Sequence, residues 1–278
     1  MKPAAAIVGC ALALATAAGA SSAIRIRTFR FIDHSRTITS PGGRRIPRPL
    51  VTVVRFPAAP GRYPLVVFGH GFALSPADYA PLLNAWATAG FVVAAPVFPL
   101  GNRNAPGGPR ESDIVNQPRD MRFVITRVLA VLKRSVDAGR IAVAGHSDGA
   151  VTALAVAYGA RYRDRRVDAA IVMSGATLAG MGAFAKRGPP LLATQGTADP
   201  INAPANTSAY FAEAPRPKFL LWLEGASHRL PYTTEQPQLG LVERVTIAFL
   251  DHYLKGRSLR ALVGAARPAA LARLIADP

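Results

Sequence analysis

The sequence contains one cysteine, Cys10, among its 278 residues. Because this cysteine lies near the start of the chain, the remaining residues have no thiol. Disulfide bonds, a cysteine nucleophile and a cysteine-ligated metal are therefore excluded there. A chain of roughly 250 residues buries a core large enough to be stable without disulfide bonds, and this length favours one domain.

Acidic residues are also scarce, since 16 Asp and Glu stand against 33 Lys and Arg, for a net charge of +17. Such a balance can indicate nucleic-acid binding. However, the arginines are scattered, and the densest group, residues 161–166, includes an acid and only one aromatic residue. We therefore expect no nucleic-acid partner. We interpret the charge as a solvated surface that attracts anionic cell envelopes or substrates.

Long apolar runs are absent except at the N-terminus, where Lys2 precedes an uncharged, alanine-rich stretch. Residues 1–20 have the layout of a secretory signal peptide, with a cleavage motif at residues 18–20 and a second possible site after Ala23. The alternatives are an uncleaved anchor and a lipoprotein modified at Cys10. Cleavage would leave one domain, residues 24–278, exported to the periplasm, the cell envelope or the medium.

The pattern of apolar residues predicts an α/β fold with a mostly parallel sheet. Two early strands, joined by a Gly/Pro turn, predict an antiparallel entry into that sheet. Strands and helices then alternate, which is typical of parallel βαβ units. The expected strands are 23–31, 50–56, 64–72, 91–96, 140–146, 168–175, 189–196 and 218–226, and the expected helices are 76–90, 116–135, 149–160, 203–214 and 240–256. Residues 260–278 are expected to form a short surface helix interrupted by Pro268.

Chemically active residues lie at or just past the ends of four of the expected strands. Phe72 ends the segment His-Gly-Phe, Ser147 lies in Gly-His-Ser-Asp-Gly, Asp199 lies in Thr-Ala-Asp-Pro, and His228 ends Gly-Ala-Ser-His. In an open α/β sheet, ligands bind beyond the carboxyl ends of the strands. A G-x-S-x-G pattern alone is weak, but here it stands between an apolar strand and a helix. The four loops together predict one site.

These residue types suit nucleophilic catalysis. A serine hydroxyl becomes a nucleophile when a base takes its proton, and His228 can do so for Ser147. Asp199 would hold the other ring N–H of the histidine and stabilise the imidazolium. The backbone N–H groups of Phe72 and Asp148 are the expected oxyanion donors.

Other residues compete for two of these roles. Asp113 and Asp168 are alternative acids, but Asp199 follows a strand and precedes the histidine. His34 and His252 are alternative bases, although His34 lies near a turn before the sheet and His252 lies within the last long helix. His70 and His146 flank glycines in two of the loops, and we expect them to shape the site.

With these motifs, the chain from about Arg25 to Gly256 resembles the α/β-hydrolases. It is most similar to the branch that holds chlorophyllases, cutinase-like polyester hydrolases and platelet-activating-factor-acetylhydrolase-like esterases. The resemblance implies a three-layer fold and hydrolysis of carboxylic esters through an acyl-enzyme, without a metal or organic cofactor. Asp148 stands where these relatives usually carry Met, Gln or Arg. Ser174 and Gly175 stand where polyester hydrolases commonly place a tryptophan.

About 15 residues, 175–189, separate two of the strands where such folds often insert a cap, so no large lid is expected. An open cleft would suit small-molecule or lipid-like esters with short or medium acyl chains. Its expected lining residues are His70, Phe72, Leu74, His146, Met181 and Phe184. Two alternative functions remain: an inactive hydrolase fold that serves as a binding or envelope protein, and an amide or peptide hydrolase with the same triad.

Overall fold

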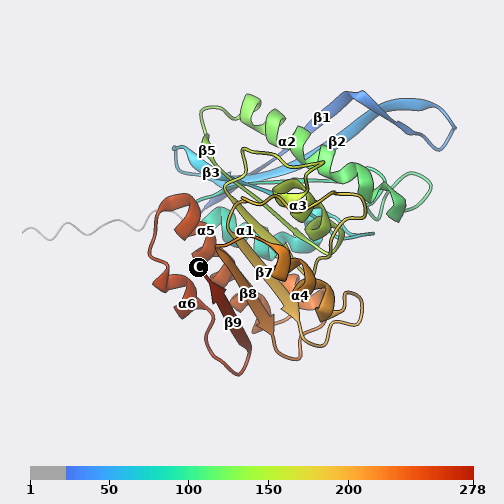
Figure 1. The fold of residues 1–278 in the computed structure, drawn as a ribbon. Helices are drawn as coiled ribbons and strands as arrows, with labels where there is room; N and C mark the ends of the chain where they lie inside the picture. Colours follow the sequence, from blue (N-terminus) through green and yellow to red (C-terminus); the bar gives the residue numbers. More distant parts are fainter. Residues whose placement is uncertain (1–22) are drawn as a thin grey trace, which may run out of the picture.

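The computed structural model describes residues 23–278, and the predicted signal peptide lies outside them (Figure 1). The described chain confirms the α/β class, with one nine-stranded sheet in the order β1-β2-β4-β3-β5-β6-β7-β8-β9. The strands are β1 (Ile24–Thr39), β2 (Arg45–Pro57), β3 (Tyr63–Gly69), β4 (Val92–Pro96), β5 (Val136–His146), β6 (Ala169–Met173), β7 (Leu191–Gly196), β8 (Lys218–Leu223) and β9 (Ala272–Asp277).

Helices cover both faces of this sheet, so the molecule has three layers. The central strands are apolar on both faces because each face packs against helices; every residue of β4, β6 and β7 is buried. One core cluster joins the sheet to α1 (Ala80–Thr88), α5 (Gln238–Lys255) and α6 (Arg260–Ala265). A second cluster joins the other face to α2 (Gln117–Val131), α3 (Asp148–Tyr158) and α4 (Pro204–Glu213).

The strands from β3 to β8 that neighbour one another are parallel. Their carboxyl ends therefore meet at one edge of the sheet. The loops that follow β3, β5, β7 and β8 carry the four predicted motifs, so the topology gathers them there. Two short 3-10 helices follow β3 and β8, namely η1 (Pro76–Tyr79) and η3 (Leu230–Tyr232), and a third, η2 (Glu111–Asn116), lies between β4 and α2.

The first two strands form a long antiparallel hairpin whose far end projects beyond the rest of the molecule (Figure 1). Buried ion pairs join it to the helical layer. Arg48 of β2 is only 2% exposed, and its guanidinium donates to the carboxylates of Asp113 in η2 and Asp120 in α2. Arg36 of β1 lies 2.7 Å from the Asp120 carboxylate. These charges fix the hairpin against α2.

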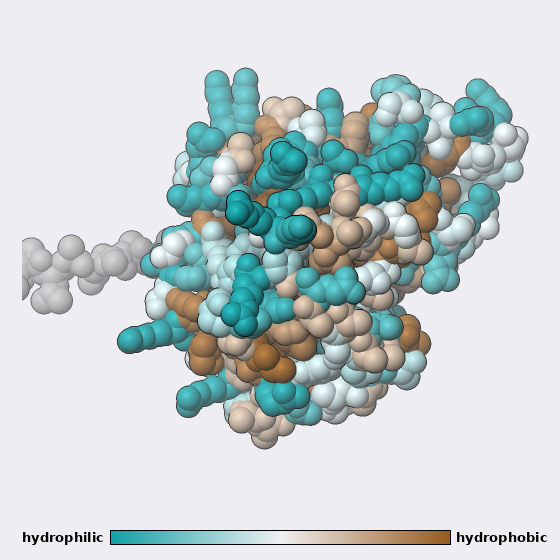
Figure 2. Space-filling model, in the orientation of Figure 1, coloured by the Kyte–Doolittle hydropathy of each residue, from teal (hydrophilic) through white to brown (hydrophobic). Residues whose placement is uncertain are grey.

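Most of the remaining arginines lie on the surface. On α2, Arg119, Arg122 and Arg127 are exposed. Figure 2 shows hydrophilic side chains spread over the part of the molecular surface where α2 and the hairpin lie. The net positive charge is thus carried largely by a solvated exterior.

The short helix expected in residues 260–278 is present and stops before Pro268, but the residues after this proline form a strand that was not predicted. Helix α6 ends at Ala265, and residues 272–277 form β9, which pairs antiparallel with β8 from Ala272 opposite Leu223 to Asp277 opposite Lys218. Pro268 cannot continue the helix. Beyond it, residues 272–277 form backbone hydrogen bonds with the edge of β8, which would otherwise lack a neighbouring strand. This pairing joins distant segments, so local periodicity does not reveal it.

The short connection between β6 and β7 agrees with the expected absence of a large lid. Residues 174–190 contain no helix, and Phe184 makes an isolated bridge to Gly159. Within residues 23–278, no helix combines the length and apolarity that a membrane span requires.

Candidate active site

Ser147 stands at the turn from β5 into α3, with φ 55° and ψ −122°. This conformation is costly for a residue with a side chain and is maintained by the packing around it. A Cβ at Gly145 would lie 2.0 Å from the Gly149 carbonyl oxygen, and one at Gly149 would lie 2.0 Å from the Gly69 carbonyl oxygen. Both glycines are therefore required by close backbone contacts, and the turn presents the serine above the end of the sheet.

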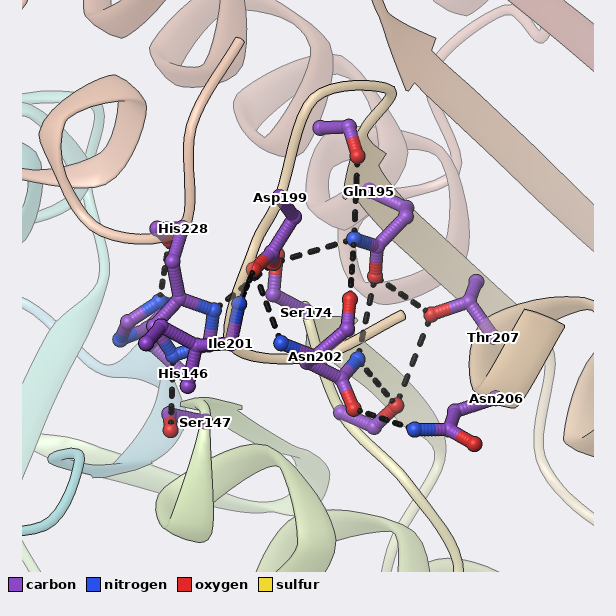
Figure 3. A network of polar contacts seen from close by, with 12 residues as sticks. His146, Ser147, Ser174, Gln195, Asp199, Ile201, Asn202, Asn206, Thr207 and His228 are labelled. Atoms are coloured by element: carbon purple, nitrogen blue, oxygen red, sulfur yellow. Dashed lines mark hydrogen bonds and ion pairs between the residues drawn. The ribbon is translucent and has the colours of Figure 1, made fainter. Parts of the chain in front are cut away.

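The structure brings Ser147, His228 and Asp199 together in one hydrogen-bonded row (Figure 3). His228 Nδ1 lies 2.7 Å from Asp199 Oδ2, and its Nε2 lies 2.9 Å from Ser147 Oγ. A carboxylate only accepts, so Nδ1 carries the proton and Nε2 is free to accept from the serine hydroxyl. This is the geometry that an activated serine requires.

The two alternative acids lie elsewhere. Asp113 binds Arg48 beneath the hairpin. Asp168 accepts the backbone N–H of Ile141, where β5 pairs with the start of β6, away from the carboxyl ends. Neither makes a hydrogen bond to His228 in the described chain.

Four hydrogen bonds saturate the Asp199 carboxylate. Oδ1 accepts the backbone N–H groups of Ile201 and Asn202, both at 2.9 Å. Oδ2 accepts from His228 and from the Gln195 side-chain amide, the latter at 3.0 Å. Burial alone would raise the pKa of Asp199, but the hydrogen bonds from Asn202, His228 and Ile201 outweigh it and hold the pKa below its usual value. The carboxylate is thus ionised and fixed in orientation.

Gln195 was not singled out by the sequence motifs. Its Oε1 accepts from Thr207 at 2.7 Å and from Asn202 at 3.2 Å, which aligns its amide toward Asp199 (Figure 3). The available signal was an amide side chain in the fully buried strand β7, whose only other polar side chain is the smaller Thr194. A buried amide must find partners, and here they include the predicted acid.

His146 joins three of the loops. Its Nε2 donates to the backbone carbonyl of His228 at 2.8 Å, so its Nδ1 accepts from the Tyr79 hydroxyl at 2.7 Å. Tyr79 in turn accepts the Gly71 N–H at 3.2 Å. Burial, with the nearby His228, lowers the pKa of His146 to about 3, so this imidazole stays neutral and acts as a brace. Tyr79 was also missed, because it comes from the helical segment after the loop.

His70 is buried in a similar way. Its Nε2 accepts the Phe98 N–H at 3.0 Å, and its Nδ1 donates to the Gly71 carbonyl at 2.8 Å. Burial lowers its pKa to about 4. His70 therefore holds the backbone of the loop that carries Phe72, as its position beside a glycine led us to expect.

The two predicted oxyanion donors are available. Neither the Phe72 nor the Asp148 backbone N–H donates to another residue of the described chain. Asp148 is the first residue of α3, where helix amides have no intrahelical acceptor. A Cβ on Gly71 would lie 3.2 Å from the Ser147 Cβ, so the loop of Phe72 packs directly against the serine.

A pocket of about 360 Å³ opens beside Ser147 and His228. Its rim is partly apolar, since Val115 and Ile201 are 46% and 73% exposed. Its lining residues are Glu111, Ile114, Val115, Ser147, Asp148, Val151, Ser174, Ala176, Thr177, Leu178, Ala179, Ile201, Asn202 and His228.

The predicted lining residues do not line this pocket. Leu74 and Met181 are 9% and 3% exposed and belong to core clusters, and Phe184 stacks on Tyr158. His70 and His146 are buried and serve the loops. Phe72 is 36% exposed but also lies outside the lining. The prediction failed because η2, a segment distant in sequence, forms one wall.

No group of three or more His, Cys, Asp or Glu in residues 23–278 is arranged to hold a metal ion. The side chains around Ser147 are those of acid–base and nucleophilic chemistry.

The family model described as chlorophyllase matches residues 26–206, well over half of the chain. The chain belongs to the chlorophyllase family. Among plant relatives, it is 34% identical over 119 residues to chlorophyllase type 0 of Chenopodium album and 36% identical over 105 residues to chlorophyllase-1 of Arabidopsis thaliana. These alignments cover 41% and 37% of this chain but only 33% and 31% of the relatives.

The fold of this chlorophyllase-family chain is similar to that of a solved ferulic acid esterase from Streptomyces cinnamoneus. The TM-score is 0.72, with 90% of this chain and 94% of that chain covered. At 22% sequence identity, the likeness establishes the α/β-hydrolase architecture.

Proposed function

We propose that this chain is a serine esterase that hydrolyses carboxylic esters through an acyl-enzyme intermediate. Ser147 Oγ attacks the carbonyl carbon of the ester while His228 Nε2 takes the hydroxyl proton. Asp199 keeps Nδ1 protonated and stabilises the imidazolium. The backbone N–H groups of Phe72 and Asp148 donate to the oxyanion of the tetrahedral intermediate, each contributing roughly 3 to 4 kcal/mol.

The intermediate then collapses and the bond to the alcohol oxygen breaks. His228 returns its proton to this oxygen, so the alcohol leaves and the acyl group remains as an ester on Ser147. Water attacks this second ester, again losing a proton to His228. The carboxylic acid leaves, and the proton returns to Ser147 Oγ.

One observation carries the proposal. Ser147, His228 and Asp199 come from three separate loops, yet two hydrogen bonds of 2.9 and 2.7 Å link them in the order that the chemistry needs. Membership of the chlorophyllase family and the likeness to a ferulic acid esterase support ester hydrolysis. The pocket volume and the exposed Val115 and Ile201 favour esters with a small or medium apolar group.

A fluorophosphonate probe followed by mass spectrometry tests the proposal. We expect an adduct on Ser147 that disappears in His228→Ala, together with hydrolysis of 4-nitrophenyl butanoate. Ser208→Ala, which removes an exposed hydroxyl from α4, is the matched control and should label fully. An adduct on a different serine would overturn the site. No adduct on folded protein would favour the inactive binding protein.

Export also remains a prediction, since it rests on residues 1–20. Expression of the full chain in a bacterial host, with N-terminal sequencing of the recovered protein, tests it. We expect a new N-terminus after Ala20 or Ala23, and an intact Met1 in the cytoplasm would contradict export.

A further inference from the structure

The pocket beside Ser147 has a charge opposite to that of the whole protein. Lys and Arg outnumber Asp and Glu by 33 to 16, yet the pocket lining includes two carboxylates, Asp148 and Glu111, and no Lys or Arg. Arg229, which directly follows His228, lines a separate hollow with Arg103 and Asp78. An acidic lining is thus a departure from the composition of the chain, and it is located where the substrate must bind.

Asp148 has a carboxylate that no side chain in the described protein satisfies. Its Oδ2 is buried and has no hydrogen-bond partner, and it takes part in no ion pair. Desolvation, together with the charge of Glu111, raises the pKa of Asp148 to about 6. The carboxylate is still ionised at pH 8, next to the serine that carries the reaction.

Glu111 also lines the pocket and comes from a separate element, η2. Its side chain makes no ion pair or hydrogen bond with another described residue, and the residue is exposed. Two unpaired carboxylates on separate elements, η2 and α3, therefore face one pocket. Their negative potential is not cancelled within the lining, since the polar residues Ser174, Thr177 and Asn202 are neutral.

We propose that Asp148 and Glu111 make the site select its substrates by charge. Esters with a cationic group near the scissile bond are preferred over neutral esters, and neutral esters over anionic ones. This inference rests on the proposed esterase function. A quaternary ammonium in the pocket supplies the positive charge that the pocket lining lacks, whereas a sulfonate or carboxylate there is repelled by both side chains. At separations of a few ångströms and partial desolvation, one such charge changes kcat/KM by about tenfold.

Three esters of similar shape measure this preference. Choline butanoate, 3,3-dimethylbutyl butanoate and 2-sulfonatoethyl butanoate carry a cationic, a neutral and an anionic tetrahedral group on the same two-carbon arm. All release butanoate, which a pH-stat at pH 8 measures directly. We expect kcat/KM to fall by about tenfold from the cationic to the neutral ester and again to the anionic ester.

The variants Asp148→Asn, Glu111→Gln and their combination remove the charges with little change in shape. The double variant should bring the three values of kcat/KM to within about threefold. Asp137→Asn is the matched control, because Asp137 lies at the opposite end of β5 from Ser147 and pairs with exposed Arg140. It removes one negative charge and should leave the ratios unchanged. If Asp148→Asn does not fold, Glu111→Gln alone must still reduce the discrimination.

Binding of the same three esters to Ser147→Ala, measured by calorimetry, separates the two proposals. Hydrolysis without a charge preference, or a preference that survives the double variant, overturns this inference and leaves the esterase function standing. Charge-selective binding to Ser147→Ala without hydrolysis by the native protein overturns the esterase function and supports the charge assignment. Neither hydrolysis nor selective binding overturns both.

Discussion

Two pairs of carboxylates, Asp113 with Asp120 and Glu111 with Asp148, differ in whether basic side chains balance their charge. Asp113 and Asp120 are 5% and 0% exposed, and both accept from Arg48 under the β1–β2 hairpin. Asp148 and Glu111 line the pocket beside Ser147 with no basic partner. The short helix η2 supplies one acid to each group, Asp113 to the first and Glu111 to the second.

The difference indicates what each group does. Buried charges that are fully paired hold elements together, and removing one partner is costly because the other stays buried. An unpaired carboxylate in a pocket reduces stability, and a bound cation would supply the partner that the lining lacks. The first group therefore fixes the hairpin, whereas the carboxylates of the second group are free to accept hydrogen bonds or an ion pair from a ligand.

The largest expected effect concerns the site and leaves the Arg48 group untouched. Asp199→Asn should lower kcat by about 10³- to 10⁴-fold, because the amide favours the wrong tautomer of His228. Steady-state kinetics on a soluble ester and circular dichroism measure activity and folding together. Asp168→Asn is the matched control and should keep kcat close to the native value. Full activity in folded Asp199→Asn would assign the acid to another residue.

The next largest effect is expected when the ion pairs of Arg48 are removed. Arg48→Met should lower the free energy of unfolding by about 3 to 5 kcal/mol, since Asp113 and Asp120 lose their partner while buried. Urea unfolding gives this value, and kcat of the remaining folded protein should not change. A loss below about 1 kcal/mol would show that the hairpin does not depend on these ion pairs.

A smaller effect is expected at Asp148, where the stability change on substitution should depend on pH. The pKa of Asp148 is raised from 3.8 to about 6 in the folded protein, so the protonated form is favoured by folding. This contribution to stability is complete below about pH 4 and is lost as the pH rises through about 6. Asp148→Asn does not titrate, so it should be more stable than the native protein at pH 8, by up to about 3 kcal/mol, and equal to it at pH 3.5. Thermal unfolding at the two pH values measures both, and an equal difference at each would contradict the assignment.

The smallest effect is expected at the surface. Asp137 and Arg140 form an ion pair of 3.3 Å with side chains 33% and 53% exposed. Asp137→Asn should change the free energy of unfolding by less than about 1 kcal/mol at any pH, because water screens exposed pairs. Urea unfolding of this variant sets the baseline for the Arg48→Met measurement, and a larger change would weaken the distinction between paired and unpaired acids.

The sequence alone predicted the fold class and the position of the four loops, because both depend on local signals. Apolar runs that alternate with amphipathic helices indicate a parallel sheet, and such a sheet gathers its carboxyl-end loops whatever the remaining details. Ser147, Asp199 and His228 could be chosen in this way. Their catalytic roles remain predictions that labelling and kinetics will decide.

What was not predictable depends on contacts between segments that are distant in sequence. Strand β9 exists because the edge of β8 needs a partner, and local periodicity in residues 260–278 does not reveal that edge. Likewise, η2 forms one wall of the pocket, whereas Met181 and Leu74 turn into the core. Gln195 could have been noticed as a buried amide, but its bond to Asp199 requires the folded loop.

The backbone of Ser147, with φ 55° and ψ −122°, has a consequence for the evolution of this family. Glycine adopts this conformation without the penalty of roughly 1 to 3 kcal/mol that a side chain incurs there. Glycine at this position would therefore stabilise the turn, and under the proposed function it would abolish hydrolysis. Under the proposed function, a lineage freed from selection for hydrolysis should drift toward glycine here, and a serine kept at this turn in relatives would indicate selection for a nucleophile.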